Sequence, residues 1–205
     1  MMGRLLRNRH GASAAEFAMV LPLLLLFIFA IIDAGRFLWE FNRAEKATQV
    51  GARVAVVTDV IPAGLATADY VGVSGLTQGD VIPASALGTL TCSRTACSCS
   101  GTCPAIGTIN STAFDEIATR MRQMKPDIQN ANIQVEYRGS GLGYAGDPNG
   151  MDVSPIVTVR LVTTPAQTAL KFKPLTTMFL GGISFTMPEF AASLTAEDAS
   201  GTQSN

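Results

Sequence analysis

The sequence of 205 residues is poor in charged side chains and in the residues that enzymes use most often. Charged residues make up 15% of the chain, against about 25% in an average globular protein. There is one histidine, His10, and the formal net charge is -1. Because no basic stretch follows the first ten residues, we expect no nucleic-acid partner.

The lack of histidine also argues against an enzyme. His10 lies near the N-terminus, so no Ser-His or Cys-His pair is expected in the rest of the chain. Phosphate-binding motifs of the Walker and Rossmann types are missing as well. The scattered acids have no spacing typical of paired catalysis, which leaves an acid-only hydrolase as the weaker alternative. We therefore expect no enzyme activity, no cofactor, no metal and no small-molecule substrate.

The shortage of charge is concentrated in one segment. Residues 12–32 are almost entirely apolar and carry a single charge, Glu16. A helix over these residues would be roughly 30 Å long, which matches the hydrocarbon thickness of a membrane. Arg4, Arg7 and Arg9 precede it, and basic residues hold their end of a span in the cytoplasm. We predict an inner-membrane protein with a cytoplasmic N-terminus and a periplasmic or extracellular C-terminal domain.

Three interpretations of the apolar segment compete. A cleaved secretory signal peptide is disfavoured, because Asp33-Ala-Gly-Arg36 and a helical pattern follow the segment. A plain single-span anchor is the second interpretation. The third gives a function to Glu16, because a bare carboxylate at membrane depth is costly unless it is paired. If Glu16 instead lies in the headgroup region, within reach of Arg9, its charge costs little free energy.

The spacing around Glu16 favours a functional acid. Residues 9–17, Arg-His-Gly-Ala-Ser-Ala-Ala-Glu-Phe, resemble a prepilin peptidase site, in which cleavage follows the glycine and the fifth residue of the product is glutamate. Cleavage between Gly11 and Ala12 would remove a basic leader, residues 1–11, and leave a positively charged amino group on Ala12. The resemblance implies that this amino group, or that of a neighbouring subunit, pairs with Glu16.

The wider segment resembles the N-terminal motif of the TadE-like family, the pseudopilins or minor pilins of the bacterial tight-adherence (Flp) pilus. The Glu16-Phe17 pair, Pro22 six residues after the acid, and Asp33-Ala-Gly-Arg36 carry the resemblance. It implies an assembly role for Glu16 and Phe17, with the prepilin peptidase, other pilins and Tad assembly platform proteins as partners. The alternative is an unprocessed, single-pass periplasmic scaffold or binding protein.

The helix is predicted to continue past the membrane over residues 33–58. Apolar side chains recur there every three or four residues, at Phe37, Phe41, Ala44, Ala47, Val50 and Val54. This spacing indicates an amphipathic helix that packs its apolar face against a domain and ends at about Val57. A membrane-spanning helix that extends into a small domain is also the pilin-like, lollipop layout that the family resemblance implies.

Residues 59–195 are predicted to form an α+β domain, followed by a frayed tail over 196–205. A helix is expected from Asn110 or Ser111 to about Lys125, where Pro126 ends it. Alternating patterns predict strands over residues 133–138, 156–164 and 183–194, with shorter strands near 70–73 and 80–82. We expect a small antiparallel sheet with the long helix across one face.

Four cysteines lie in a predicted loop over residues 92–103: Cys92, Cys97, Cys99 and Cys103. A zinc site usually shows two Cys-x-x-Cys pairs, and an exported domain lies in an oxidising compartment, so two disulfides are favoured. A bond between Cys97 and Cys99 would strain a very short loop, which leaves two connectivities open. Further along, Asp147, Asn149 and Asp152 resemble part of a calcium loop, but the missing spacing and terminal glutamate favour a turn.

Overall fold

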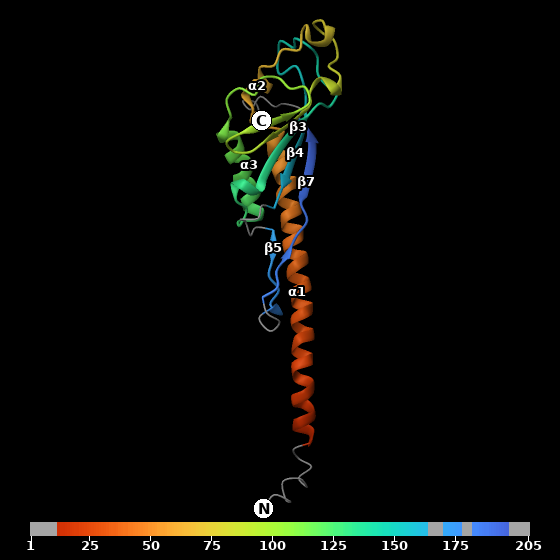
Figure 1. Cartoon of the computed structure of the whole chain (residues 1–205), viewed down its shortest axis with the longest axis vertical. Coiled ribbons are helices and arrows are strands. Elements are labelled where there is room, and N and C mark those ends of the chain that lie inside the picture. The colour runs from red at the N-terminus through yellow and green to blue at the C-terminus, as the bar shows by residue number, and fades with distance from the viewer. Residues whose placement is uncertain (1–11, 164–169, 178–181, 197–205) are drawn as a thin grey trace, which may run out of the picture. The chain divides into compact units, whose positions relative to one another are not determined.

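The computed structural model describes residues 12–163, 170–177 and 182–196. The chain divides into two compact units. Unit 1 comprises Met1–Phe41 and Lys171–Thr186, and unit 2 comprises Asn42–Leu170 and Met187–Asn205. A long apolar helix, α1 (Ala12–Ala55), is followed by a small antiparallel sheet domain, which confirms the predicted α+β class (Figure 1).

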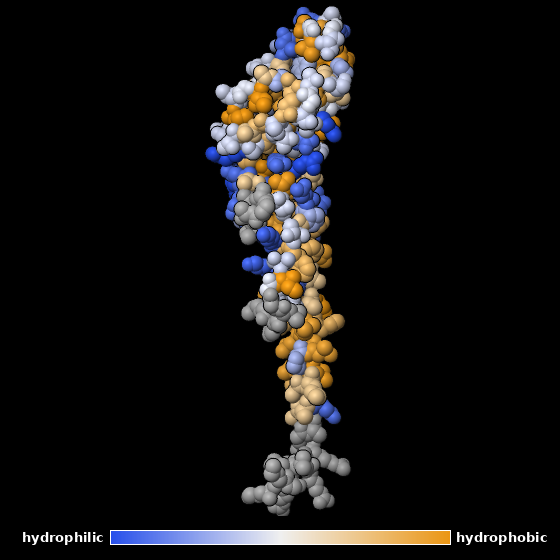
Figure 2. Space-filling model, viewed as in Figure 1, coloured by the Kyte–Doolittle hydropathy of each residue, from blue (hydrophilic) through white to orange (hydrophobic). Residues whose placement is uncertain are grey.

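The first half of α1 is apolar and exposed on all sides. The helix is 44 residues long and includes Pro22, which does not interrupt it. It is long and apolar enough to cross a membrane, and its apolar window is unburied. Figure 2 shows hydrophobic side chains gathered along this part of α1. A helix that is hydrophobic all round and largely exposed suits a lipid environment.

The second half of α1 buries a stripe of small residues against unit 2. The buried residues are Ala44, Ala47, Thr48, Gly51, Ala52 and Ala55. Of the predicted stripe, Ala44 and Ala47 are buried, whereas Phe37, Phe41, Val50 and Val54 are half-buried. Small side chains let the helix approach closely: a Cβ atom added to Gly51 would lie 2.8 Å from Met121 Sδ and 3.1 Å from Val159 Cγ1.

One antiparallel five-stranded sheet forms the centre of unit 2, in the order β2-β1-β3-β4-β7. Its strands are β1 (Thr89–Cys92), β2 (Cys97–Ser100), β3 (Ile133–Arg138), β4 (Ile156–Leu161) and β7 (Phe190–Thr195). The strand predicted over 133–138 is confirmed, and the one predicted from Ile156 ends at Leu161. The predicted final strand is split into β6 (Phe185–Thr186) and β7, and Pro188, which has no N–H to donate, lies between them.

The sheet buries one face and leaves the other polar. Val135 pairs with Val159, and both lie on the buried face with Tyr137, whose hydroxyl accepts a hydrogen bond from Ile61 N at 3.1 Å. The opposite face carries the Arg160–Glu136 ion pair at 2.9 Å. This alternation is typical of an antiparallel sheet that packs against helices on one side.

The helix α3 (Ser111–Met124) joins α1 in covering the buried face. Asn110 caps it by accepting a hydrogen bond from Ala113 N at 3.1 Å, and Phe114, Ile117 and Met121 are buried. The helix ends before Lys125, so both predicted boundaries are confirmed. The core of unit 2 is therefore one layer of sheet beneath α3 and the second half of α1.

The short strands predicted near 70–73 and 80–82 are wrong. The chain instead forms a turn and the 3-10 helix η3 (Val73–Gly75), and Val81 makes an isolated bridge to Tyr144. Gly72 adopts a φ of 85°, a left-handed conformation that ends an extended run. The other short helices are α2 (Ala63–Ala66), η4 (Ala84–Ala86) and η5 (Asn130–Asn132).

Ala196, predicted as the first residue of a frayed tail, is instead buried, and its N–H donates a hydrogen bond to Pro155 O at 2.8 Å. The prediction for the rest of the tail, residues 197–205, falls outside the described residues.

The close packing at Gly51 predicts a destabilising substitution. Gly51→Leu should lower the free energy of unfolding by about 1–3 kcal/mol, because the added side chain overpacks the contact with Met121 and Val159. Thermal unfolding of the full chain in detergent, followed by circular dichroism, measures this change. Gly35→Leu is the matched control, since nothing lies within 4 Å of a Cβ atom added there. Equal stability of the two variants would contradict the packing argument.

Candidate assembly site

The predicted processing and assembly residues lie at the beginning of α1. Ala12 is the first residue of the helix, and Gly11, just before it, lies outside the described residues. Glu16 and Phe17 are exposed. Residues 12 and 16 are about one helical turn apart and share a face, so an amino group on Ala12 and the carboxylate of Glu16 would lie at the same end of the helix.

A second polar centre in unit 1 was not anticipated. Asp33, the acid of the Asp-Ala-Gly-Arg motif, is 6% exposed although it directly follows the apolar segment. Its carboxylate accepts hydrogen bonds from Leu175 N at 2.7 Å, Thr176 N at 2.9 Å and Thr176 Oγ1 at 3.0 Å. Arg36 Nη1 donates a further bond at 3.1 Å. The buried charge is therefore stabilised by several donors, as such a group requires.

Aromatic contacts continue this centre along α1. The ring of Phe37 meets that of Phe172 edge-on, with centroids 5.4 Å apart, and Phe41 lies 6.3 Å from Phe37. The Arg36 guanidinium lies 5.4 Å from the centroid of the Phe172 ring, within the range of a cation–π interaction. These contacts and the Asp33 hydrogen bonds hold residues 171–177 along α1, where Figure 1 shows β5 (Lys171–Phe172).

The cysteine-rich stretch is a β-hairpin rather than a loop. Cys92 ends β1, while Cys97 begins β2 and Cys99 continues it, and disulfides join Cys92 to Cys97 and Cys99 to Cys103. This is one of the two connectivities that the sequence left open. The loop prediction failed because small polar residues and cysteines give a weak strand pattern, although Leu90 and Cys92 both point into the core.

An ion pair fixes the turn of that hairpin. Arg94 binds Asp115 on α3 with two hydrogen bonds, from Nε at 2.7 Å and from Nη2 at 2.8 Å. The hydrogen bonds from Arg94 lower the pKa of the Asp115 carboxyl below its ordinary value. The two disulfides and the Arg94–Asp115 pair hold β1 and β2 beside α3. This is a structural role, and the cysteine spacing does not include the Cys-x-x-Cys motif of redox proteins.

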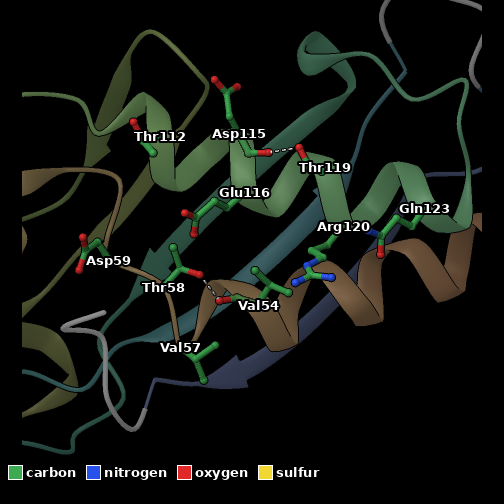
Figure 3. Close-up of a pocket in the computed structure, with 10 residues that line it drawn as sticks. All are labelled: Val54, Val57, Thr58, Asp59, Thr112, Asp115, Glu116, Thr119, Arg120 and Gln123. Carbon is green, nitrogen blue, oxygen red and sulfur yellow. Dashed lines mark hydrogen bonds between the residues drawn. The ribbon is translucent and has the colours of Figure 1, made fainter. Parts of the chain in front are cut away.

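An open groove of about 840 Å³ lies in unit 2 between the end of α1 and α3 (Figure 3). Asp59, Glu116 and Arg120 line it, together with uncharged side chains such as Val57 and Thr112. Asp115, which binds Arg94, also lines it, so the groove is a polar surface that carries charges of both signs.

The partial calcium pattern is a turn. Asp152 accepts hydrogen bonds from three main-chain N–H groups, those of Tyr70 at 2.8 Å, Gly146 at 3.0 Å and Asp147 at 3.0 Å. Its carboxylate is thus used to order two loops. Among the described residues, no group of three or more His, Cys, Asp or Glu side chains is placed to hold a metal ion.

Comparison with known proteins supports the N-terminal motif. Residues 11–53 match the family model described as TadE-like protein, which confirms the resemblance to that family. The match begins at Gly11 and covers about a fifth of the chain, including the apolar segment, Asp33 and the buried stripe of α1. No curated protein and no solved structure matches the chain.

The hydrogen bonds of Asp33 predict how residues 171–177 respond to its loss. Asp33→Ala should accelerate tryptic cleavage after Lys171, because the N–H groups of Leu175 and Thr176 lose their acceptor. Timed proteolysis of the detergent-solubilised chain, read by mass spectrometry, measures the rate. The matched control is Asp69→Ala, because Asp69 accepts a hydrogen bond from Val71 N within its own turn in unit 2. Cleavage at the same rate in both variants would show that Asp33 does not hold this segment.

Proposed function

We propose that the chain is a TadE-like minor pilin or pseudopilin, processed after Gly11 by a prepilin peptidase and incorporated into a Tad (Flp-type) pilus apparatus. The observation that carries this proposal is the family match over residues 11–53, which begins at the proposed cleavage site and contains the apolar part of α1. The proteolytic step belongs to the peptidase, and this chain is its substrate.

Processing would place a new positive charge on Ala12, one helical turn from the Glu16 carboxylate. Hydrolysis of the Gly11–Ala12 peptide bond releases the leader with Arg4, Arg7 and Arg9 and creates an amino group on Ala12, which is charged near neutral pH. The processed chain then has 12 basic and 16 acidic residues and a formal net charge of -4. The basic residues of the leader serve to orient the helix before cleavage.

Assembly would exchange lipid for other helices around the first half of α1. Phe17, Leu23 and Phe27 are exposed, so their apolar surface is available for contact with neighbouring pilin helices. Within such a bundle Glu16 would lie away from water, and an isolated carboxylate there is expensive. Pairing with the amino group of Ala12, in the same or a neighbouring subunit, removes that cost and favours one register between subunits.

Processing predicts a change of mass that depends on the peptidase. In cells that carry the prepilin peptidase, the membrane-bound chain should begin at Ala12, because the leader has been removed. In cells without the peptidase it should retain residues 1–11. Intact mass spectrometry of the purified chain distinguishes these forms. An intact leader in both strains would favour the alternative of a permanently anchored periplasmic scaffold or binding protein.

The role of the acid predicts a defect in assembly without a defect in insertion. Glu16→Ala should abolish or strongly reduce pilus formation, because the amino group of Ala12 loses its partner, while the chain still fractionates with the membrane. Counting pili by electron microscopy tests this expectation. Glu45→Ala is the control, since Glu45 is an exposed acid later in the same helix. Normal piliation of the Glu16 variant would indicate that the acid is merely interfacial.

A further inference from the structure

Unit 1 contains a second apolar element besides α1. Residues 174–186 carry no charge, and Lys171 and Lys173 precede them. Phe172 pairs with Phe185 between β5 and β6, and Gly182 N donates a hydrogen bond to Thr177 O at 3.0 Å, so the described residues form a hairpin. We call the described part of this element, residues 171–177 and 182–186, the membrane-proximal hairpin.

The hairpin exposes large apolar side chains. Ile183 is 53% exposed and Phe185 is 55% exposed, and Leu175 is exposed as well. Their charged neighbours, Lys171 and Lys173, are also exposed. A patch with apolar side chains beside basic ones is the composition by which proteins lie in the interface of a membrane.

Contacts with α1 set the level of the hairpin relative to the proposed span. Leu175 and Thr176 bind Asp33, the first residue after the predicted span, and Phe172 packs on Phe37. Because a helix rises 1.5 Å per residue, Phe37 lies about 7 Å beyond Ile32. The headgroup region of one leaflet is roughly 5–7 Å thick. The hairpin and this stretch of α1 therefore occupy the same interfacial layer.

We infer that the membrane-proximal hairpin docks on the outer surface of the bilayer that α1 spans, with Leu175, Ile183 and Phe185 in contact with lipid and the two lysines among headgroup phosphates. The occupant of this apolar patch is thus lipid, because the patch is continuous with the exposed apolar surface of α1. Asp33 positions the hairpin at this depth. The inference rests on the membrane insertion of α1 that the proposed function requires.

Depth-dependent quenching tests this inference on the full chain in liposomes of phosphatidylethanolamine and phosphatidylglycerol. A single added cysteine is labelled with the fluorophore NBD at position 183, 26 or 142, in the variants Ile183→Cys, Leu26→Cys and Leu142→Cys. Position 26 reports the span, and Leu142, which is 55% exposed in unit 2, is the matched control for an exposed apolar residue. The unmodified chain controls for labelling of its own cysteines, which form disulfides.

The label at position 183 should emit at shorter wavelength than the label at 142, and shallow nitroxide-labelled lipids should reduce its fluorescence several-fold. Iodide in the water should quench the label at position 142 more strongly than the label at position 183. Quenching of position 183 by iodide, with position 26 quenched by lipid, would overturn the inference and leave the span intact. A label at 183 that neither quencher reaches would indicate a protein occupant, such as a second copy, and would also overturn it. Failure of lipid quenching at position 26 would instead contradict the span and the proposed function with it.

Discussion

As the membrane-spanning helix that we propose, α1 has to keep its main-chain hydrogen bonds in two surroundings, a bilayer and the surface of a sheet. In hydrocarbon an unpaired N–H or C=O group costs several kcal/mol, so an unbroken helix is one of the few structures that the first half can adopt. The same helix continues through Asp33 to Ala55, where a one-sided stripe of small residues packs into unit 2. In the first half of α1 the side chains are apolar on all sides, and in the second half one stripe of them is buried. The backbone is helical in both halves.

Asp33 lies where these two patterns meet. A carboxylate directly after an apolar span would face water in a plain anchor, yet here it is buried by residues that lie 142 and 143 positions later in the sequence. The main-chain N–H groups of Leu175 and Thr176 offset the free-energy cost of burying this carboxylate. They also hold the membrane-proximal hairpin beside Asp33 on α1. The family match includes Asp33 and Arg36, so the acid belongs to the recognised N-terminal segment although its main-chain donors, Leu175 and Thr176, do not. An inserted helix and a lipid-contacting hairpin would together give unit 1 two separate contacts with one membrane.

Local patterns in the sequence were sufficient to predict the helix ends and most of the sheet. Asn110 and Pro126 bracket α3 because caps and breakers act on their immediate neighbours, and the alternation in β3 identifies its buried face directly. The hairpin of β1 and β2 was missed because cysteine, serine and threonine give little hydrophobic contrast. Gly51 was missed for a related reason, since close packing selects for small size rather than for hydrophobicity. The distant donors were beyond prediction, because Leu175 and Thr176 lie 142 and 143 residues from Asp33 and Tyr70 lies 82 residues from Asp152.

The central claim is that the beginning of α1 changes from lipid contact to contact with other pilin-type subunits once the leader has been removed. Site-specific photo-cross-linking from position 17 tests it most directly, because Phe17 is exposed beside Glu16. A photoreactive phenylalanine analogue at this position should cross-link to a second pilin-type chain in cells that have the prepilin peptidase, and these products should disappear in cells that lack it. Cross-linking to protein that is unchanged by loss of the peptidase, or cross-linking to lipid alone in both strains, would contradict the account.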